Sequence, residues 1–323
     1  MAAPPSKFIL PDLISHCSYP LRISPHRMQV CRASEAWIVG ELTAACYPDA
    51  DAFHLQVASD YLNFLFTFDD WSDEFDAANT HGLADCVMNA LHDPEGYQTD
   101  KAAGKLAKCF FRRYRQTGGL GCIRRFIHTM DLFFKAVAQQ AKDRTLQEIP
   151  DLEEYIALRW DTSGCKPCFA LIEFAAGIDL PDDVVQHPTI QALEEATNSL
   201  VTWSNDIFSY NVEQARRDTH NMIVVVMQEQ GFTLQEAINF VGGLCKASID
   251  RFEADRRVSI YPSSYRHVHT TNSAYGPVAI AIENSPICII NLCGRQPPMR
   301  SSRSRDFMTL STSLLSETLV LNH

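Results

Sequence analysis

Residues 61–74 read YLNFLFTFDDWSDE, an apolar run that ends in a cluster of acidic side chains. Apolar positions recur here and further along the chain at spacings of three and four residues, at Tyr61, Leu62, Leu65 and Phe68, at Phe110, Phe111 and Tyr114, and at Phe126, Met130, Phe133 and Val137. This spacing is the period of one buried face of an α-helix. It holds from about residue 51 to residue 257, where alternating strand patterns are absent, so we predict an all-α fold.

Turn-forming residues divide this stretch into separate helices. They occur at residues 92–96 (HDPEG), 117–119 (TGG), 149–151 (IPD) and 180–183 (LPDD). In the last two, a proline and acidic residues stand at a helix start, where the missing N–H costs nothing and negative charge suits the helix dipole. Because no repeat or linker interrupts the pattern, we predict one helical domain over residues 1–258.

Composition excludes several classes of function. The net charge is −11 and basic residues do not cluster over most of the chain, whereas a nucleic-acid surface needs grouped Lys and Arg. The eleven cysteines are spaced unevenly, unlike those of a disulfide framework. No signal peptide is evident, and no apolar stretch approaches the roughly 20 residues that span a bilayer. We therefore expect a reduced, cytoplasmic protein without a nucleic-acid partner and without stable membrane insertion.

The acidic cluster after the apolar run is the first candidate metal site. On a helix, Asp69 and Asp73 lie one turn apart, so both carboxylates leave the same face, while Asp70 points off that face. Carboxylates this close repel one another, and Mg²⁺, which takes oxygen ligands, would offset the repulsion. A solvated helix end is the alternative, and the cluster alone does not decide between the two.

A second set of oxygen donors lies within residues 205–213, NDIFSYNVE. Asn205, Ser209 and Glu213 are four residues apart, so two helical turns place them on one stripe. An amide oxygen, a hydroxyl and a carboxylate suit Mg²⁺ better than zinc, although a solvent-facing stripe would show the same spacing. The pairing of two oxygen-donor helices, both beside aromatic sequence, favours a magnesium cluster that faces a diphosphate.

Cysteine spacing suggests a different chemistry, which we set aside. Cys165 and Cys168 have the spacing of a thioredoxin-like redox motif, but that motif needs a strand before its helix and both flanks here are helical. One such pair without a second pair of ligands is also poor evidence for zinc.

Together, the two oxygen-donor motifs resemble those of class I terpene synthases. Residues 69–73 match the aspartate-rich DDxxD pattern, and residues 205–213 match the NSE triad, N-D-x-x-S-x-x-x-E. The segment NDIFSYNVEQ, followed by DTHN at residues 218–221, is similar to the corresponding segment of fungal sesquiterpene synthases, particularly those of basidiomycetes. The similarity runs from about residue 7 to residue 257. It implies a helical bundle around a central active-site cavity.

The resemblance also implies roles for individual side chains. Magnesium, as three ions for which Mn²⁺ can substitute, would be held by Asp69, Asp73, Asn205, Ser209 and Glu213. Asp70 would support these ligands without binding the metal itself. Arg159 occupies the place of an arginine that senses the diphosphate, and Thr162 would link it to a backbone carbonyl near Ser163 that helps to trigger ionisation. Without the family resemblance, we would interpret Arg159 as a surface residue in a salt bridge, although a guanidinium is well suited to bind phosphate.

The implied reaction is the ionisation of farnesyl diphosphate, followed by cyclisation of the carbocation to a sesquiterpene and release of diphosphate. Leu62, Leu65 and Phe66 share a helical face with Asp69 and are candidates to line the dry cavity that a carbocation needs. Each of the three is at least as well explained as an ordinary core residue. The expected partner is a small prenyl diphosphate, and the protein is expected to be a monomer or a homodimer.

The sequence departs from the family's pattern after residue 258. The family usually ends with helices that cap the site and an Arg-Tyr pair that contacts the diphosphate, whereas here the nearest pair is reversed, Tyr265-Arg266. Val212 also stands where a lysine often precedes the triad's glutamate. We expect residues 259–323, which proline and glycine interrupt, to be a divergent and poorly helical segment, disordered or the product of mis-splicing.

Three alternatives stay open from the sequence. The chain could be a cyclase of geranyl or geranylgeranyl diphosphate, a catalytically impaired homologue without the closing C-terminal helices, or a helical binding protein. A chain-elongating prenyltransferase is disfavoured, because those enzymes usually carry two aspartate-rich motifs and no NSE triad.

Overall fold

The computed structural model describes residues 8–257, apart from residues 18, 34–36, 75–76, 147 and 217. The side chains of residue 38 and of residues 69–81 are likewise outside the described part. Residues 259–323, which we expected to be divergent and poorly helical, also lie outside it, so the domain boundary near residue 258 stays a prediction.

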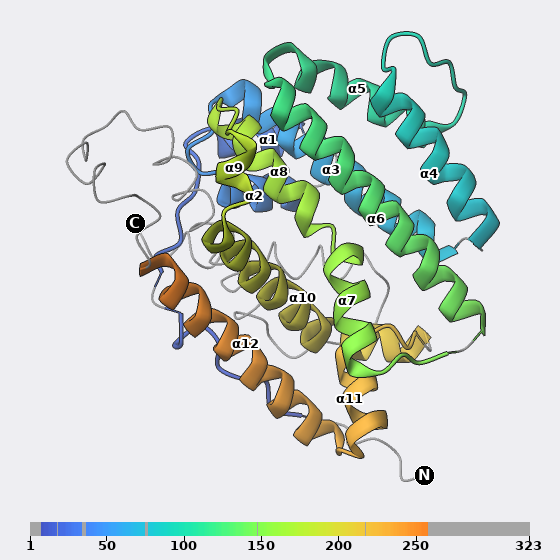
Figure 1. The fold of residues 1–323 in the computed structure, drawn as a ribbon, viewed down its shortest axis with the longest axis vertical. Coiled ribbons are helices and arrows are strands. Elements are labelled where there is room, and N and C mark those ends of the chain that lie inside the picture. Colours follow the sequence, from blue (N-terminus) through green and yellow to red (C-terminus); the bar gives the residue numbers. More distant parts are fainter. Residues whose placement is uncertain are drawn as a thin grey trace.

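The described part of the chain is helical and contains no strand, which confirms the all-α prediction (Figure 1). Its twelve helices are α1 (Arg27–Ala33), α2 (Trp37–Cys46), α3 (Ala52–Glu74), α4 (Ala77–His92), α5 (Ala102–Thr117), α6 (Leu120–Leu146), α7 (Leu152–Thr162), α8 (Cys165–Ala176), α9 (Asp182–Val185), α10 (Pro188–Arg216), α11 (Met222–Gln230) and α12 (Leu234–Arg257). The long helix α10 lies alongside α12, and α6 packs against α4, α7 and α8.

The helices end where the sequence supplies turn chemistry. α4 ends at His92 and α5 at Thr117, at the predicted breaks. α7 begins after Asp151, whose side chain accepts a hydrogen bond from the Glu154 backbone N–H at 2.8 Å and so satisfies a donor that the helix start leaves free. α9 begins directly after Pro181. The local signals read from the sequence therefore place these boundaries correctly.

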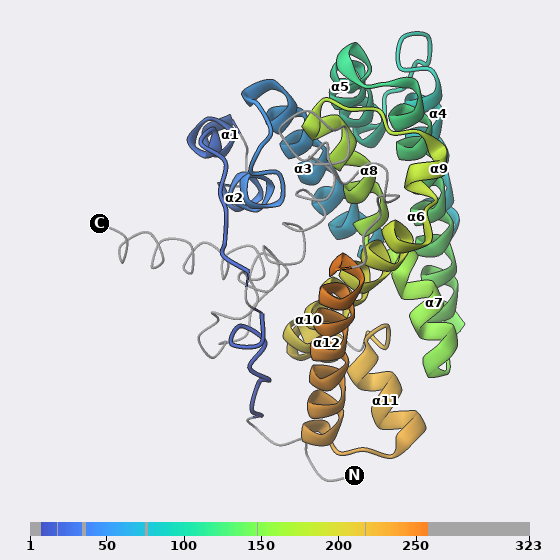
Figure 2. The same cartoon turned by 60° about the vertical axis from the view of Figure 1, so that its left-hand side comes forward.

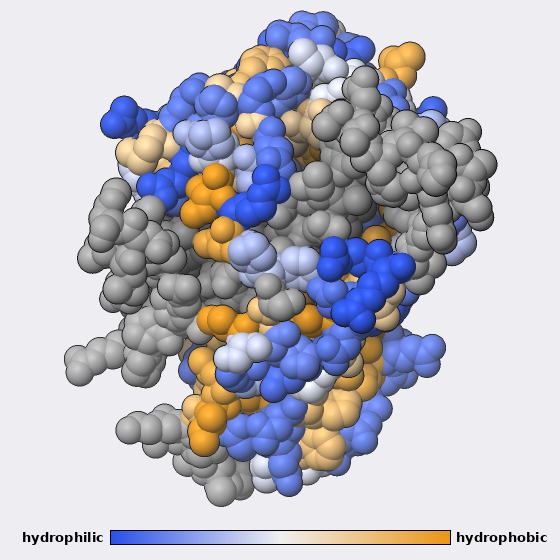
Figure 3. Space-filling model, turned by 90° about the vertical axis from the view of Figure 1, so that its left-hand side faces the viewer, coloured by the Kyte–Doolittle hydropathy of each residue, from blue (hydrophilic) through white to orange (hydrophobic). Residues whose placement is uncertain are grey.

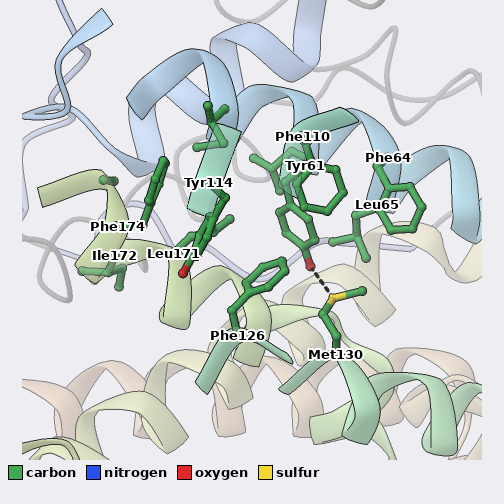
Figure 4. Packing of buried hydrophobic residues seen from close by; sticks show 14 of the residues in the cluster. Tyr61, Phe64, Leu65, Phe110, Tyr114, Phe126, Met130, Leu171, Ile172 and Phe174 are labelled. Atoms are coloured by element: carbon green, nitrogen blue, oxygen red, sulfur yellow. Dashed lines mark hydrogen bonds between the residues drawn. The ribbon is translucent and has the colours of Figure 1, made fainter. Parts of the chain in front are cut away.

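One hydrophobic core lies between α3, α5, α6 and α8, and aromatic rings fill much of it (Figure 4). Phe126 of α6 is fully buried and stacks on Phe111 of α5, with the ring centroids 5.7 Å apart. The Tyr61 hydroxyl of α3 lies 3.5 Å from the Met130 sulfur of α6. Because aromatic rings bury large areas and pair at preferred angles, this cluster contributes to the packing of α3 against α6.

A second hydrophobic core lies between α7, α10, α11 and α12 and includes the N-terminal segment. Figure 2 shows α10, α11 and α12 grouped together, with α5 and α8 of the first core above them. Phe8 meets Tyr210 of α10 edge-on, with 6.5 Å between the ring centroids. Pro11 passes so close to α12 that a Cβ at Gly242 would lie 2.7 Å from its Cβ. α10 contributes to both cores and therefore joins them.

A network of ion pairs fastens α6 to α8 and to the segment that follows it. Arg125 donates from Nη2 to Glu173 at 2.6 Å and to Asp179 at 3.1 Å, and from Nη1 to Asp182 at 2.6 Å. Asp179 also accepts a hydrogen bond from the Cys122 backbone N–H, at the start of α6. These contacts hold this end of α6 against α8 and against the segment that follows α8.

The described surface is mixed in character. Figure 3 shows hydrophobic residues in small groups among hydrophilic ones on one face of the molecule. Among the described helices, none has both the length and the apolar character needed to cross a bilayer.

The aromatic core yields a test of stability. Phe126→Ala removes a fully buried ring that several neighbouring rings contact, so we expect a loss of about 3–5 kcal/mol in the free energy of unfolding. Denaturant unfolding followed by helical circular dichroism measures it. Leu120→Ala, at an 84% exposed position of the same helix, is the control and should change stability by less than about 0.5 kcal/mol. Equal effects of the two substitutions would contradict this packing.

Glu194 of α10 yields a pH-dependent test. Burial raises the pKa of its carboxyl to about 7, and the charge of Glu173 adds to the shift, while Lys166 and Arg125 oppose it. A carboxyl whose pKa is higher in the folded than in the unfolded state contributes stability at low pH and loses that contribution as the pH rises toward 7. We therefore expect Glu194→Gln to gain stability relative to the parent at about pH 8 but not at about pH 4.5, in thermal unfolding at both values. A gain that is the same at both would show that this carboxyl titrates normally.

Candidate active site

α7 and α8 meet at a break that lies against α10. Gly164, between the two helices, has a φ of +70°, a backbone conformation that favours glycine. Asn198 of α10 is 3% exposed, and its Nδ2 donates to the Trp160 backbone oxygen at 2.8 Å. The Ser163 hydroxyl in turn donates to Asn198 Oδ1 at 2.9 Å. These bonds satisfy groups at the end of α7 and hold the predicted Ser163 against α10.

Leu65, one of the three predicted cavity-lining residues, lies at this break. A Cβ built at Gly164 would be 3.0 Å from Leu65 Cδ2, so α3 and the break are in direct contact. Leu65 and Leu62 are 8% and 4% exposed and belong to the first core, and Phe66 packs partly buried against it. Figure 4 shows Leu65 beside Phe64 at the edge of the aromatic cluster. A lining role for the three residues remains a prediction.

Arg159 of α7 directs its guanidinium at α10. Its Nε and Nη2 donate to Asp206 Oδ1 at 3.1 and 2.9 Å, and Nη2 also donates to Asn205 Oδ1 at 2.8 Å. The side chain is 12% exposed, so it is not the surface residue that the sequence alone would suggest. Burial by itself would lower the pKa of Arg159, but Asp206, Tyr155 and Glu213 together outweigh burial and raise it. The guanidinium therefore stays protonated beside the predicted triad.

The triad residues lie along α10, and all three are partly buried, which a solvent-facing stripe would not be. Ser209 donates its hydroxyl proton to the Asn205 backbone oxygen at 2.8 Å, which leaves the hydroxyl lone pairs free to ligate. Burial raises the pKa of Glu213 to about 7 and the charge of Asp206 adds to this, while a hydrogen bond from Asn221 opposes it. A bound cation would stabilise the ionised form of such a carboxyl, so these oxygen donors fit a hard divalent metal.

The aspartate-rich motif stands at the end of α3, whose helical backbone continues to Glu74. The side chains of Asp69, Asp70 and Asp73 lie outside the described residues, so their direction toward the triad remains a prediction. Among the described side chains, no three from His, Cys, Asp and Glu gather closely enough to hold a metal. A zinc site of the usual kind is thus not found in the described part of the chain.

Four residues that complete the arrangement received no role from the sequence: Tyr155, Asp206, His220 and Asn221. The Tyr155 hydroxyl donates to Asp206 Oδ2, and Asn221 Nδ2 donates to Glu213 Oε2 at 2.8 Å. The Thr162 hydroxyl lies 3.2 Å from His220 Nε2. Burial lowers the pKa of His220 to about 3, so its ring is neutral. A sequence signal existed for Tyr155, which stands one helical turn before Arg159.

The redox alternative finds no support in the geometry. Cys165 and Cys168 are both free, on a helix that follows another helix. Burial raises the pKa of Cys165 to about 11, which suppresses the reactive thiolate.

Comparison with known proteins identifies the family. The family model described as terpene synthase family 2, C-terminal metal binding, matches residues 60–251, which include both predicted motifs. The chain belongs to the terpene synthase family. The resemblance read from its motifs is therefore confirmed, and a divalent metal is implied for this terpene synthase.

Three relatives of this terpene synthase carry sesquiterpene synthase or muurolene synthase names. Sesquiterpene synthase 1 of Postia placenta is 49% identical over 287 residues, which cover 80% of this chain and 85% of that protein. Sesquiterpene synthase Agr1 of Cyclocybe aegerita is 48% identical over 268 residues, with 77% and 78% covered. Alpha-muurolene synthase of Coprinopsis cinerea is 48% identical over 274 residues, with 77% and 64% covered.

Solved structures agree on the fold. Linalool/nerolidol synthase from Streptomyces clavuligerus superposes with a TM-score of 0.72 at 21% identity, covering 88% of this chain and 97% of that chain. The SVS_A2 protein from ancestral sequence reconstruction superposes with a TM-score of 0.71 at 22% identity, covering 93% and 89%. The helical-bundle prediction is thus confirmed.

The break between α7 and α8 can be tested with two glycines. Gly164→Ala combines strain of about 1–2 kcal/mol from the positive φ with a Cβ that meets Leu65 at 3.0 Å. Gly177→Ala carries comparable strain, at a φ of +65°, but has nothing within 4 Å of its Cβ. We expect both substitutions to lower the melting temperature and only Gly164→Ala to lower the rate of terpene formation. Equal activity of the two variants would show that the Leu65 contact does not shape the site.

Proposed function

We propose that this terpene synthase is a sesquiterpene synthase, which ionises farnesyl diphosphate, cyclises the carbocation and releases diphosphate. The names of relatives at 48–49% identity support the choice of a sesquiterpene product. The observation that carries the proposal is the contact of Arg159 Nη2 with Asn205 Oδ1 at 2.8 Å. This contact places a protonated guanidinium beside the oxygen donors proposed to bind the metal, and that combination suits a diphosphate.

Two helices supply the residues proposed to hold Mg²⁺. We propose three ions, for which Mn²⁺ can substitute. The proposed ligands are Asp69 and Asp73 from α3, supported by Asp70, and Asn205, Ser209 and Glu213 from α10. Bound ions would stabilise the charge that develops on the departing diphosphate. α3 and α10 both contact the break between α7 and α8, through Leu65 and Asn198 respectively. These shared contacts support the two helices facing one site.

Arg159, Thr162 and Ser163 are proposed to sense the diphosphate and help to trigger its departure. Arg159 would bind the diphosphate with the protonated guanidinium, which is suited to forked contacts with phosphate oxygens. The Thr162 hydroxyl is within 3.4 Å of the Arg159 backbone oxygen, and Ser163 is bonded to Asn198. A shift of Arg159 would therefore reach the backbone around Ser163, where the resemblance implies a carbonyl that promotes ionisation.

The hydrocarbon chain needs dry surroundings, because water would quench a carbocation. Leu62, Leu65 and Phe66 are proposed to line that part of the cavity. Leu65 has the strongest support, since it contacts Gly164 next to Ser163. An apolar wall at this place would exclude water from the carbon that loses the diphosphate.

Product analysis tests the proposed function. The protein is incubated with geranyl, farnesyl or geranylgeranyl diphosphate, each with and without Mg²⁺, and the extracts are separated by gas chromatography. We expect a sesquiterpene from farnesyl diphosphate that requires the metal. Products from only the shorter or the longer substrate would replace this proposal by a cyclase of that chain length. No product from any of them would identify an impaired homologue or a binding protein.

The proposed metal ligands can be tested by substituting one ligand on each helix, with an exposed asparagine of α10 as the control. Asn205→Ala removes a proposed ligand, and Asp69→Ala does the same on α3, so we expect each to lower magnesium-dependent turnover by at least about 100-fold without loss of helical structure. Asn211→Ala changes the same residue type at an exposed position of α10 and should leave turnover within about twofold. Full activity of both Asn205→Ala and Asp69→Ala would refute the assignment of the metal site.

A further inference from the structure

Asp206 is fully buried, at zero exposure, and the proposed function gives it no task. Four donors converge on its carboxylate: Arg159 Nε, Arg159 Nη2, the Tyr155 hydroxyl and the Met222 backbone N–H. They come from α7 and from the start of α11, while Asp206 itself belongs to α10. A buried carboxylate is costly unless such donors surround it. The fold therefore retains a charged group at a place where an apolar side chain would be simpler to accommodate.

The two carboxylate oxygens of Asp206 have different partners. Oδ2 accepts from the Tyr155 hydroxyl and, at 3.1 Å, from the Met222 backbone N–H. Both donors are buried parts of the second core, so they hold the carboxylate in one orientation. Oδ1 accepts from Arg159 alone among the described residues, through Nε and Nη2. Oδ2 is thus held by donors of α7 and α11, and Oδ1 faces the guanidinium of Arg159.

The guanidinium of Arg159 is held along one side. Its Nε and Nη2 point at Asp206, and Nη2 also donates to Asn205 Oδ1. Across the described residues, Nη1 has no hydrogen-bond acceptor. Because the guanidinium is planar and rigid, fixing the Nε and Nη2 side also determines where Nη1 points. The two N–H groups of Nη1 remain available for a ligand next to the triad.

We propose that Asp206 is a positioning residue, whose carboxylate holds one side of the Arg159 guanidinium so that Nη1 is presented to the diphosphate beside the oxygen donors of α10. This inference rests on the proposed function for the identity of the ligand. Asp206 touches neither substrate nor metal in this arrangement and acts through Arg159. A misplacement of about 1 Å in such a group can cost roughly 100-fold in rate.

The test compares Asp206→Asn, Arg159→Gln and the double variant. The asparagine side chain would keep the shape of the aspartate, but its amide NH₂ cannot accept hydrogen bonds, so either Arg159 or the pair of anchoring donors loses its partner. Turnover is measured as kcat and KM. Binding is measured as the rise in melting temperature caused by Mg²⁺ with inorganic diphosphate, without organic substrate.

We expect Asp206→Asn to lower kcat by about 100-fold and to lose the diphosphate-induced rise in melting temperature, as Arg159→Gln does. In the double variant, kcat should lie within about twofold of the lower single variant, because Asp206 acts only through Arg159. Losses that multiply in the double variant, or a retained kcat in Asp206→Asn, would overturn the proposal.

A variant with a similar local defect controls for stability. Thr197 of α10 is buried at 1% exposure, and its hydroxyl donates to the Leu193 backbone oxygen of the same helix. Thr197→Val should lower the melting temperature while kcat and the response to diphosphate stay unchanged. If it lowered kcat as Asp206→Asn does, general destabilisation would account for both and the proposal would fail.

Failure to fold is also decisive. If Asp206→Asn does not fold, Asp206→Glu keeps the charge and shifts the carboxylate by one methylene, so it should fold with a reduced kcat and a reduced response to diphosphate. If neither variant folds, Asp206 serves folding alone and the proposal is overturned. The same holds if Asp206→Glu folds with parental kcat.

The binding measurement separates this inference from the proposed function. A parent protein that diphosphate and Mg²⁺ stabilise but that forms no sesquiterpene would contradict the proposed function, and the loss of that stabilisation in Asp206→Asn would still support the role of Asp206. A parent protein that converts farnesyl diphosphate, with an Asp206→Asn variant equal to it, would overturn only the inference.

Discussion

The buried ion pair between Arg159 and Asp206 constrains the functional half of this protein. Removing two charges from water costs several kcal/mol per ion, and a buried pair offsets this only with good geometry and additional hydrogen bonds. Here the carboxylate of Asp206 has its hydrogen bonds only when α7, α10 and the start of α11 are in place together, because the donors come from α7 and α11. The pair therefore specifies one arrangement of these helices, whatever its net effect on stability. That arrangement brings a protonated guanidinium to the oxygen donors of α10.

The rest of the fold supplies a rigid frame for that pair. Rings of α3, α5, α6 and α8 fill the first core, and Arg125 fastens α6 to Glu173 of α8. α10 packs in both cores, so its packing in the first core also determines where the second core lies. The helical backbone of the site is interrupted at Gly164, where Leu65 and Asn198 approach the break from α3 and α10. These two contacts link the proposed hydrocarbon side of the site to its polar side.

The sequence predicted the helical class, four of the breaks between helices and the two oxygen-donor motifs, because these follow from local periodicity, turn chemistry and residue spacing. It placed Arg159 by family resemblance, and the structure shows the side chain against Asn205. It gave no role to Asp206, although the residue lies within the second motif. From spacing, an acid beside a proposed metal-ligating asparagine can be a ligand, a surface charge or an anchor, and only its neighbours from α7 and α11 distinguish these. His220 was missed for the same reason, since its contact with Thr162 joins residues far apart in the chain.

By itself, the sequence determined that the chain is all-α, that it carries the two motifs of a terpene synthase, and that Asn205, Ser209 and Glu213 share a helix stripe. Those features depend on residues within a few helical turns of one another, and helix geometry relates such residues directly. Only the tertiary structure decided that Arg159 is buried, that Asp206 holds it, and that Leu65 meets the break at Gly164. Each of these joins helices distant in sequence, whose relative placement follows from the packing of two cores and the need to satisfy buried polar groups.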